Sequence, residues 1–206
     1  MLRDKEVVID GVMSIRNVDV YGIDAALVRA GYPMSTEIDD MEHSIKEQGH
    51  DKLIKRGAAL GKSPVGHGDD KFLRQIIVSF DLIMPRYMWA EFDTYGFTVK
   101  NSQSTMHRTK QLDYLALADK YVDPVIMQRF LALKQIYYNN PTEENLLKVK
   151  ANLPEGIRIG AGIVTNYAQL RTIYFQRKAH RLPQWREIIC PWIKSLPYAK
   201  EFGVCD

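Results

Sequence analysis

The segment from Thr165 to Trp185 carries side chains that suit an anionic ligand. It is predicted to be helical, and its polar residues include Asn166, Arg171, Arg177 and His180. Asn166 and Arg177 are 11 positions apart, so at about 100° per residue they project within roughly 20° of each other. An amide beside a guanidinium can hold a planar anion, because Arg donates two parallel hydrogen bonds to phosphate or carboxylate. The alternative interpretation is a solvated basic face.

A second group of polar residues lies in the predicted loop 101–108, whose sequence is NSQSTMHR. Its candidate ligands are Asn101, Ser104, His107 and Arg108. Such a loop can present several hydrogen-bond donors to a phosphate or to the edge of a pyrimidine, and functional residues concentrate on loops held by a scaffold. The alternative is a hydrophilic connection with ordinary turn chemistry.

Other chemistries have little support in the sequence. His67 lies near Asp69 and Asp70, but one His and adjacent carboxylates make a poor metal site, so no metal is expected. Cys190 and Cys205 have neither metal-ligand spacing nor a disulfide framework, which fits a reducing cytoplasm. No Ser-His-Asp or Cys-His arrangement is recognisable.

Composition indicates one soluble, cytoplasmic domain spanning residues 1–206. The chain is 46% hydrophobic and 26% charged, which is ordinary for a globular protein. Its net charge of +3 is too small to indicate a nucleic-acid partner. No apolar run is long enough for a membrane span.

The hydrophobic pattern predicts more helices than strands. Strands are expected at Glu6–Asp10, Val18–Gly22 and Lys71–Met84, and the glycine-rich stretch Gly156–Gly162 is expected to be a connection. Helices are expected at Ile23–Ala30, Met41–Leu60, Arg86–Tyr95, Asp123–Asn140, after Pro141-Thr142, from Thr165 and at Gln184–Leu196. In Asp123–Asn140 the side chains expected to point inward are Val125, Ile126, Phe130, Leu133 and Ile136. The predicted fold class is α+β.

Two segments together resemble the flavin-dependent thymidylate synthases. In that family, a helix and loop that follow a long central strand carry the motif R-H-R-x-x-S-x-N-E-x-S-x-R. When Pro85 anchors the register, Asn101 falls on the motif Asn and Ser104 on the second motif Ser. The other fixed positions differ: Thr94, Tyr95 and Gly96 replace R-H-R, and Val99, Ser102 and Met106 replace the first Ser, the Glu and the last Arg.

The C-terminal helix resembles the family more closely. Asn166 and Arg177 have the family spacing of an Asn and an Arg that contact flavin and nucleotide, and His180 and Trp185 each lie within one position of a family residue. Arg74 lies near the place where the family often has a flavin-contacting His.

The resemblance implies a central, mostly antiparallel sheet flanked by helices, and a homotetramer. It also implies the methylation of dUMP to dTMP, with methylenetetrahydrofolate as carbon donor, FAD as cofactor and NADPH as reductant. Because R-H-R is replaced by uncharged residues, the charge for a phosphate must come from elsewhere. The candidates are Arg74, Lys100, His107, Arg108, Arg171 and Arg177. The alternative is a protein that keeps the fold and binds a nucleotide or flavin without turnover.

Overall fold

The computed structural model describes residues 7–9, 11–36, 41–64 and 67–206. The strands are β1 (Val7–Ile9), β2 (Met13–Tyr21), β3 (Ile77–Pro85), β4 (Val99–Ser102) and β5 (Arg158–Asn166). The α-helices are α1 (Ile23–Arg29), α2 (Met41–Lys46), α3 (His50–Gly61), α4 (Arg86–Phe92), α5 (Tyr114–Leu117), α6 (Pro124–Asn139), α7 (Glu143–Ala151), α8 (Tyr167–Arg177) and α9 (Cys190–Ser195). Two 3-10 helices, η1 (Tyr32–Met34) and η2 (Asp69–Gln75), and a π-helix, η3 (Trp185–Ile189), complete the described elements.

The described strands form one antiparallel sheet in the order β1-β2-β3-β5-β4. β3 and β5 pair along their whole length, from Ile77 opposite Asn166 to Pro85 opposite Arg158. The start of β3 therefore lies beside the end of β5, and the segments flanking them, η2 and α8, are brought together. The predicted α+β class with an antiparallel sheet and flanking helices is thus found.

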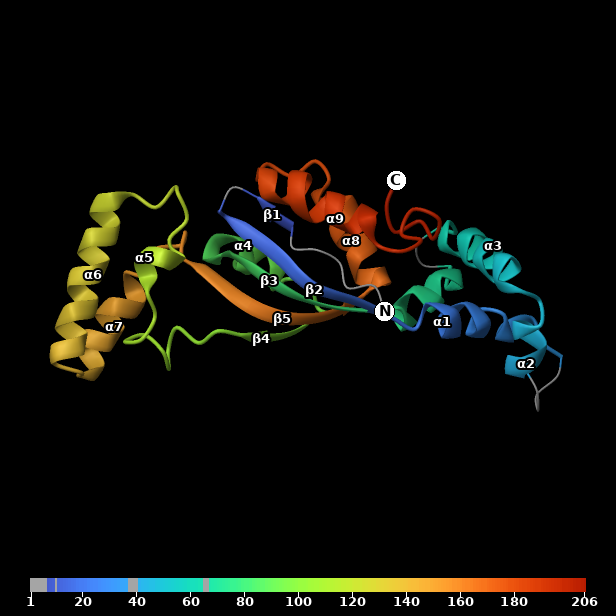
Figure 1. Cartoon of the computed structure of the whole chain (residues 1–206), viewed down its shortest axis with the longest axis horizontal. Helices are drawn as coiled ribbons and strands as arrows, with labels where there is room; N and C mark the ends of the chain where they lie inside the picture. The colour runs from blue at the N-terminus through green and yellow to red at the C-terminus, as the bar shows by residue number, and fades with distance from the viewer. Residues whose placement is uncertain (1–6, 10, 37–40, 65–66) are drawn as a thin grey trace.

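One face of the sheet forms the core. Alternate residues of β3 are buried, Val78, Phe80, Leu82 and Met84, as expected for a strand with one covered face. Helices α8 and α9 lie along the sheet (Figure 1), and the ring of Trp192 in α9 lies 4.6 Å from that of Phe80 between centroids.

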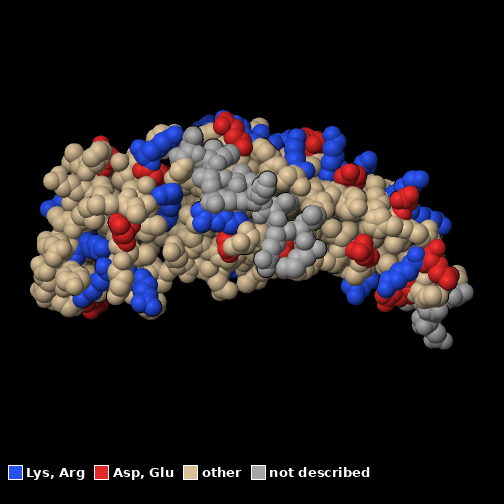
Figure 2. Space-filling view, viewed as in Figure 1, with Lys and Arg blue, Asp and Glu red and all other residues tan. Residues whose placement is uncertain are grey.

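The molecule is elongated, with the sheet in the middle, α1–α3 at one end and α6–α7 at the other (Figure 1). Lys and Arg are interspersed with Asp and Glu over the face seen in Figure 2. No described helix is both long and apolar enough to cross a bilayer.

Two predicted elements have different bounds for local reasons, and those of a third are not tested. The predicted strand Lys71–Met84 begins only near Ile77, because Phe72 and Leu73 are both buried, and successive residues of a strand point to opposite faces. The predicted helix Met41–Leu60 is two helices, since Gly49 takes φ 84° between them, which only Gly adopts readily. The ends of the predicted first strand, Glu6 and Asp10, lie outside the described residues.

The glycine-rich connection, the start of the helix that follows it and the loop after α4 also differ from the prediction. Residues 158–166 form β5, so the helix expected from Thr165 begins at Tyr167. The predicted loop after α4 contains β4, in which Asn101 pairs with Gly162 of β5. The last predicted helix, Gln184–Leu196, is found: residues 183–195 are helical without a break, as η3 and then α9. Pro191 lies in the first turn of α9, where proline is tolerated.

Helices α6 and α7 form a hairpin at one end of the molecule (Figure 1). Asp123 caps α6 by accepting from the N–H groups of Val125 and Ile126. Phe130 and Leu133 are buried as predicted, but Val125, Ile126 and Ile136 are exposed. The prediction failed there because the described part of the chain covers only the α6 face that carries Phe130.

Candidate anion-binding pocket

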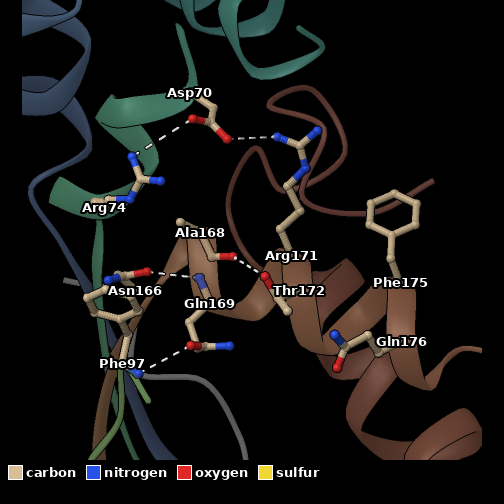
Figure 3. Close-up of a pocket in the computed structure, with 10 residues that line it drawn as sticks. All are labelled: Asp70, Arg74, Phe97, Asn166, Ala168, Gln169, Arg171, Thr172, Phe175 and Gln176. Carbon is tan, nitrogen blue, oxygen red and sulfur yellow. Dashed lines mark hydrogen bonds and ion pairs between the residues drawn. The ribbon is translucent and has the colours of Figure 1, made fainter. Parts of the chain in front are cut away.

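A cavity of about 480 Å³ opens between η2 and α8 (Figure 3). Its lining residues come from three separate parts of the sequence: Asp70 and Arg74 from η2, Phe97 from the segment before β4, and Asn166, Ala168, Gln169, Arg171, Thr172, Phe175 and Gln176 from the end of β5 and from α8. This volume lies within the range of about 300–1,000 Å³ that is usual for small-molecule sites.

Sheet pairing and helix capping place these residues. The backbone N–H of Tyr167 donates to the carbonyl of Ile76 at 3.1 Å, which ties the start of α8 to the end of η2. Asn166 is the N-cap of α8, and its Oδ1 accepts from the N–H of Gln169 at 2.9 Å. This bond satisfies one of the free N–H groups of the first helical turn. The amide nitrogen of Asn166 remains as the donor available to a ligand.

Two arginines share one carboxylate in this pocket. Arg171 Nη1 lies 3.4 Å from Asp70 Oδ2, and Arg74 Nη1 lies 3.9 Å from Asp70 Oδ1. The side chains of Asp70 and Arg171 are only 9% and 14% exposed, whereas that of Arg74 is 52% exposed. Arg171 also donates to the carbonyl of Ser63 at 3.5 Å. Two positive charges against one negative charge leave a net positive site, which favours a further anion.

The rest of the lining is apolar or amide. Phe97 and Phe175 are exposed aromatic side chains at the pocket. Gln169 is buried, and its Oε1 accepts from the N–H of Phe97 at 3.2 Å, so its amide nitrogen is the group left to donate. Flat apolar surfaces next to a few placed polar groups are what a base or an isoalloxazine ring requires.

Three of the predicted ligand residues meet in this pocket: Arg74, Asn166 and Arg171. Arg177 and His180 do not line it. Arg177 Nη1 lies 3.0 Å from Glu91 Oε2, and its Nε donates to the hydroxyl of Tyr95 at 2.7 Å. A role for Arg177 or His180 in holding a ligand stays a prediction.

The predicted loop 101–108 lies elsewhere, on β4 and the turns that follow it. Asn101 is exposed. Ser104 accepts from the N–H of His107 at 3.0 Å through its Oγ, and its carbonyl accepts from the N–H of Arg108 at 3.1 Å. These hydrogen bonds are typical of a turn, as expected if the segment is a hydrophilic connection. None of the four residues lines the pocket, and their binding role also stays a prediction.

Seven of the ten lining residues were missed in the sequence, among them Asp70, Phe97, Gln169 and Phe175. A signal existed for Asp70, since it lies four positions before Arg74 and such pairs meet on a helix. Another existed for Phe175, which follows Arg171 by four positions and so shares its helical face. Nothing local marks Phe97. Within the described ranges, no group of three or more His, Cys, Asp or Glu side chains could hold a metal ion.

The fold is known from other proteins. No protein-family model matches the chain, and no curated protein matches it. Among solved structures, it is similar to the flavin-dependent thymidylate synthase ThyX from Helicobacter pylori complexed with FAD and dUMP, at 13% identity and a TM-score of 0.67, over 91% of this chain and 98% of that one. A second structure of that enzyme with FAD and dUMP gives 12% identity and a TM-score of 0.68, over 91% and 96% of the two chains. The chain therefore has a fold like that of the flavin-dependent thymidylate synthases.

Proposed function

We propose that this chain binds a nucleotide in the pocket between η2 and α8, and that it binds without turning the ligand over. The observation that carries the proposal is the charge balance of Arg74, Asp70 and Arg171 inside a cavity edged by Phe97 and Phe175. A phosphate would be bound by the two guanidiniums. A base or flavin ring would lie against the phenylalanines.

The ligand chemistry follows from the donors. The structures with a similar fold hold FAD and dUMP, so these two are the first ligands to test. The donor set fits FAD, since Arg74 and Arg171 can meet its phosphates and the amides of Asn166 and Gln169 can meet polar edges of a ring. Bound FAD would supply hydride-transfer chemistry, and the residues named here would bind and orient it.

We propose binding without synthesis because two of the residues at the R-H-R positions, Thr94 and Tyr95, form hydrogen bonds within the chain. Thr94 donates to the carbonyl of Glu91 at 2.7 Å, and Tyr95 accepts from Arg177 at 2.7 Å. Thymidylate synthesis with methylenetetrahydrofolate and NADPH is the rival proposal, and Asn101 and Ser104 on the family motif are what favours it. Either proposal includes the homotetramer, for which light scattering would give four times the chain mass of 23.7 kDa.

The test is a calorimetric titration of the purified protein with dUMP and with FAD. Arg171→Gln is expected to weaken binding by about ten- to one-hundred-fold, because a charge-assisted hydrogen bond contributes roughly 1.5–3 kcal/mol. The matched control is Arg129→Gln, which removes an exposed arginine of α6 and should bind as the wild type does. Absence of binding of both ligands at millimolar concentration would reject the proposal. If the protein released tritium from dUMP labelled at carbon 5, binding without turnover would be wrong and the synthase proposal would be supported.

A further inference from the structure

Outside the pocket, three N–H donors converge on one carboxylate oxygen. Glu91 Oε2 lies 3.0 Å from Arg177 Nη1, 2.8 Å from Trp185 Nε1 and 3.5 Å from His180 Nε2. The donors come from the end of α8, the turn after it and the start of η3. Glu91 comes from α4, on a different part of the chain.

These donors are oriented by contacts that do not involve Glu91. The Arg177 guanidinium lies 4.8 Å from the centre of the Trp185 ring, and its Nε donates to Tyr95. His180 Nδ1 accepts from the N–H of Leu182 at 3.2 Å, so the hydrogen of the neutral ring is on Nε2, the atom nearer Glu91. Sites that bind a carboxylate or a phosphate commonly consist of hydrogen-bond donors that are already oriented in this way.

The carboxylate of Glu91 is near the surface. Its side chain is 31% exposed, against 16% for Arg177 and 22% for His180, and Trp185 is fully buried. Solvent therefore reaches the acid more readily than the donors behind it. An external anion would have to enter from the side that Glu91 occupies.

We propose that Arg177, His180 and Trp185 form an oxyanion site whose occupant is the chain's own Glu91 carboxylate. Glu91 is then a specificity-determining residue, since it keeps external carboxylates and phosphates from the Arg177 end of α8. This inference concerns a different site from the pocket at Arg74 and Arg171. It stands whether or not that pocket binds a nucleotide.

The test removes the internal carboxylate and offers a replacement. Glu91→Ala, labelled with indole-¹⁵N tryptophan, is titrated with acetate and with inorganic phosphate. The Trp185 Nε1–H signal should shift on removal of Glu91 and return toward its wild-type position as either anion is added. The signals of Trp89 and Trp192 serve as internal references, and Trp185→Phe assigns the peak. Because Trp185 does not line the pocket, phosphate bound at Arg74 and Arg171 does not produce this response.

Thermal denaturation gives a second readout. The melting temperature of Glu91→Ala should fall and recover by at least half in acetate or phosphate. Glu144→Ala, which removes an exposed acid of α7 (78% exposed), should show neither the fall nor the recovery. The double variant Glu91→Ala/Arg177→Met should lose the anion response.

Three results would overturn the inference. One is a folded Glu91→Ala protein whose Trp185 signal does not respond to either anion. Another is failure of both Glu91→Ala and the isosteric Glu91→Gln to fold even in high phosphate, which would make Glu91 an irreplaceable part of the fold. A wild-type protein whose Trp185 signal already moves with acetate would also contradict it, because the site would then be open.

Discussion

Replacing Asp70 by Asn should make the protein less stable and its pocket a better anion site. Asp70 is the only described carboxylate in the lining of the pocket, and it lies between Arg74 and Arg171. It therefore holds both guanidiniums in place and repels the phosphate that they would bind. The variant separates these two effects, because it keeps the shape of the side chain and removes its charge.

The distances give the size of each effect. At an effective dielectric constant of about 20, the 3.4 Å contact between Asp70 and Arg171 corresponds to roughly 5 kcal/mol before desolvation. Desolvation offsets much of this, and Arg171 keeps its bond to Ser63, so we expect a loss of about 2–3 kcal/mol in the free energy of unfolding. That loss lowers the melting temperature of a chain of this size by roughly 5–10 °C.

The gain in affinity comes from removing a negative charge close to the bound phosphate. For a carboxylate about 6 Å from a phosphate, the repulsion at the same dielectric constant is roughly 3 kcal/mol per charge, and screening reduces it to about 1–2 kcal/mol. Asp70→Asn should therefore bind dUMP about five- to thirtyfold more tightly in a calorimetric titration.

The matched control is Asp69→Asn, which removes the same charge from the neighbouring exposed residue. It should change neither the melting temperature nor the dissociation constant by a comparable amount. The reasoning is refuted if Asp70→Asn binds dUMP no more tightly than the wild type. In that case the loss of arginine orientation would weaken binding at least as much as the removal of the Asp70 charge strengthens it.

Three further predictions follow from other contacts. Arg177→Ala should lower the free energy of unfolding by roughly 2–4 kcal/mol in a denaturant titration, because it leaves the partly buried Glu91 carboxylate without its cation; an unchanged transition midpoint would contradict this. Cys190 and Cys205 are buried, and burial raises the pKa of the Cys190 thiol to about 11, so a thiol reagent at pH 8 should label neither residue until the protein is denatured. Burial, and then the charge of Asp119, raise the pKa of Tyr87 from 10.0 to about 12. The stability that the protonated Tyr87 contributes should therefore be complete below pH 10 and be lost as pH rises toward 12. Melting curves of Tyr87→Phe at these pH values should lack this loss.

The sequence predicted those elements whose pattern is local. The strand β3 and the helix α6 were predicted because alternation and helical spacing each depend on neighbouring residues. β5 was missed because Gly160 and Gly162 weaken a strand signal. Here they are tolerated because β5 pairs with β3 on one side and β4 on the other. The Oε1 of Gln103 also accepts from the N–H of Gly160 at 2.9 Å.

The pocket was predictable in its residue types but not in its grouping. Arg74 and Arg171 were both candidates, yet they are far apart in sequence and meet only because β3 and β5 pair. The angular argument grouped Asn166 with Arg177 instead. It failed as a guide to the pocket because Asn166 is an N-cap with φ −137° and ψ 168°, outside helical geometry, so helical periodicity does not set the direction of its side chain.

The two arginines of α8 differ in their acidic neighbours. Arg177 faces one carboxylate, Glu91, which also accepts the hydrogen bond of Trp185 Nε1 and lies 3.5 Å from His180 Nε2, so the charges of Arg177 and Glu91 are balanced. Arg171 shares its carboxylate with Arg74 at longer distances, which leaves a positive charge beside a cavity. An arginine recognised by type and spacing alone is therefore an incomplete indicator of a phosphate site. The net charge at each end of α8 is set by the balance of cations and carboxylates that the fold places there, and Asp70→Asn and Glu91→Ala each change that balance by one charge.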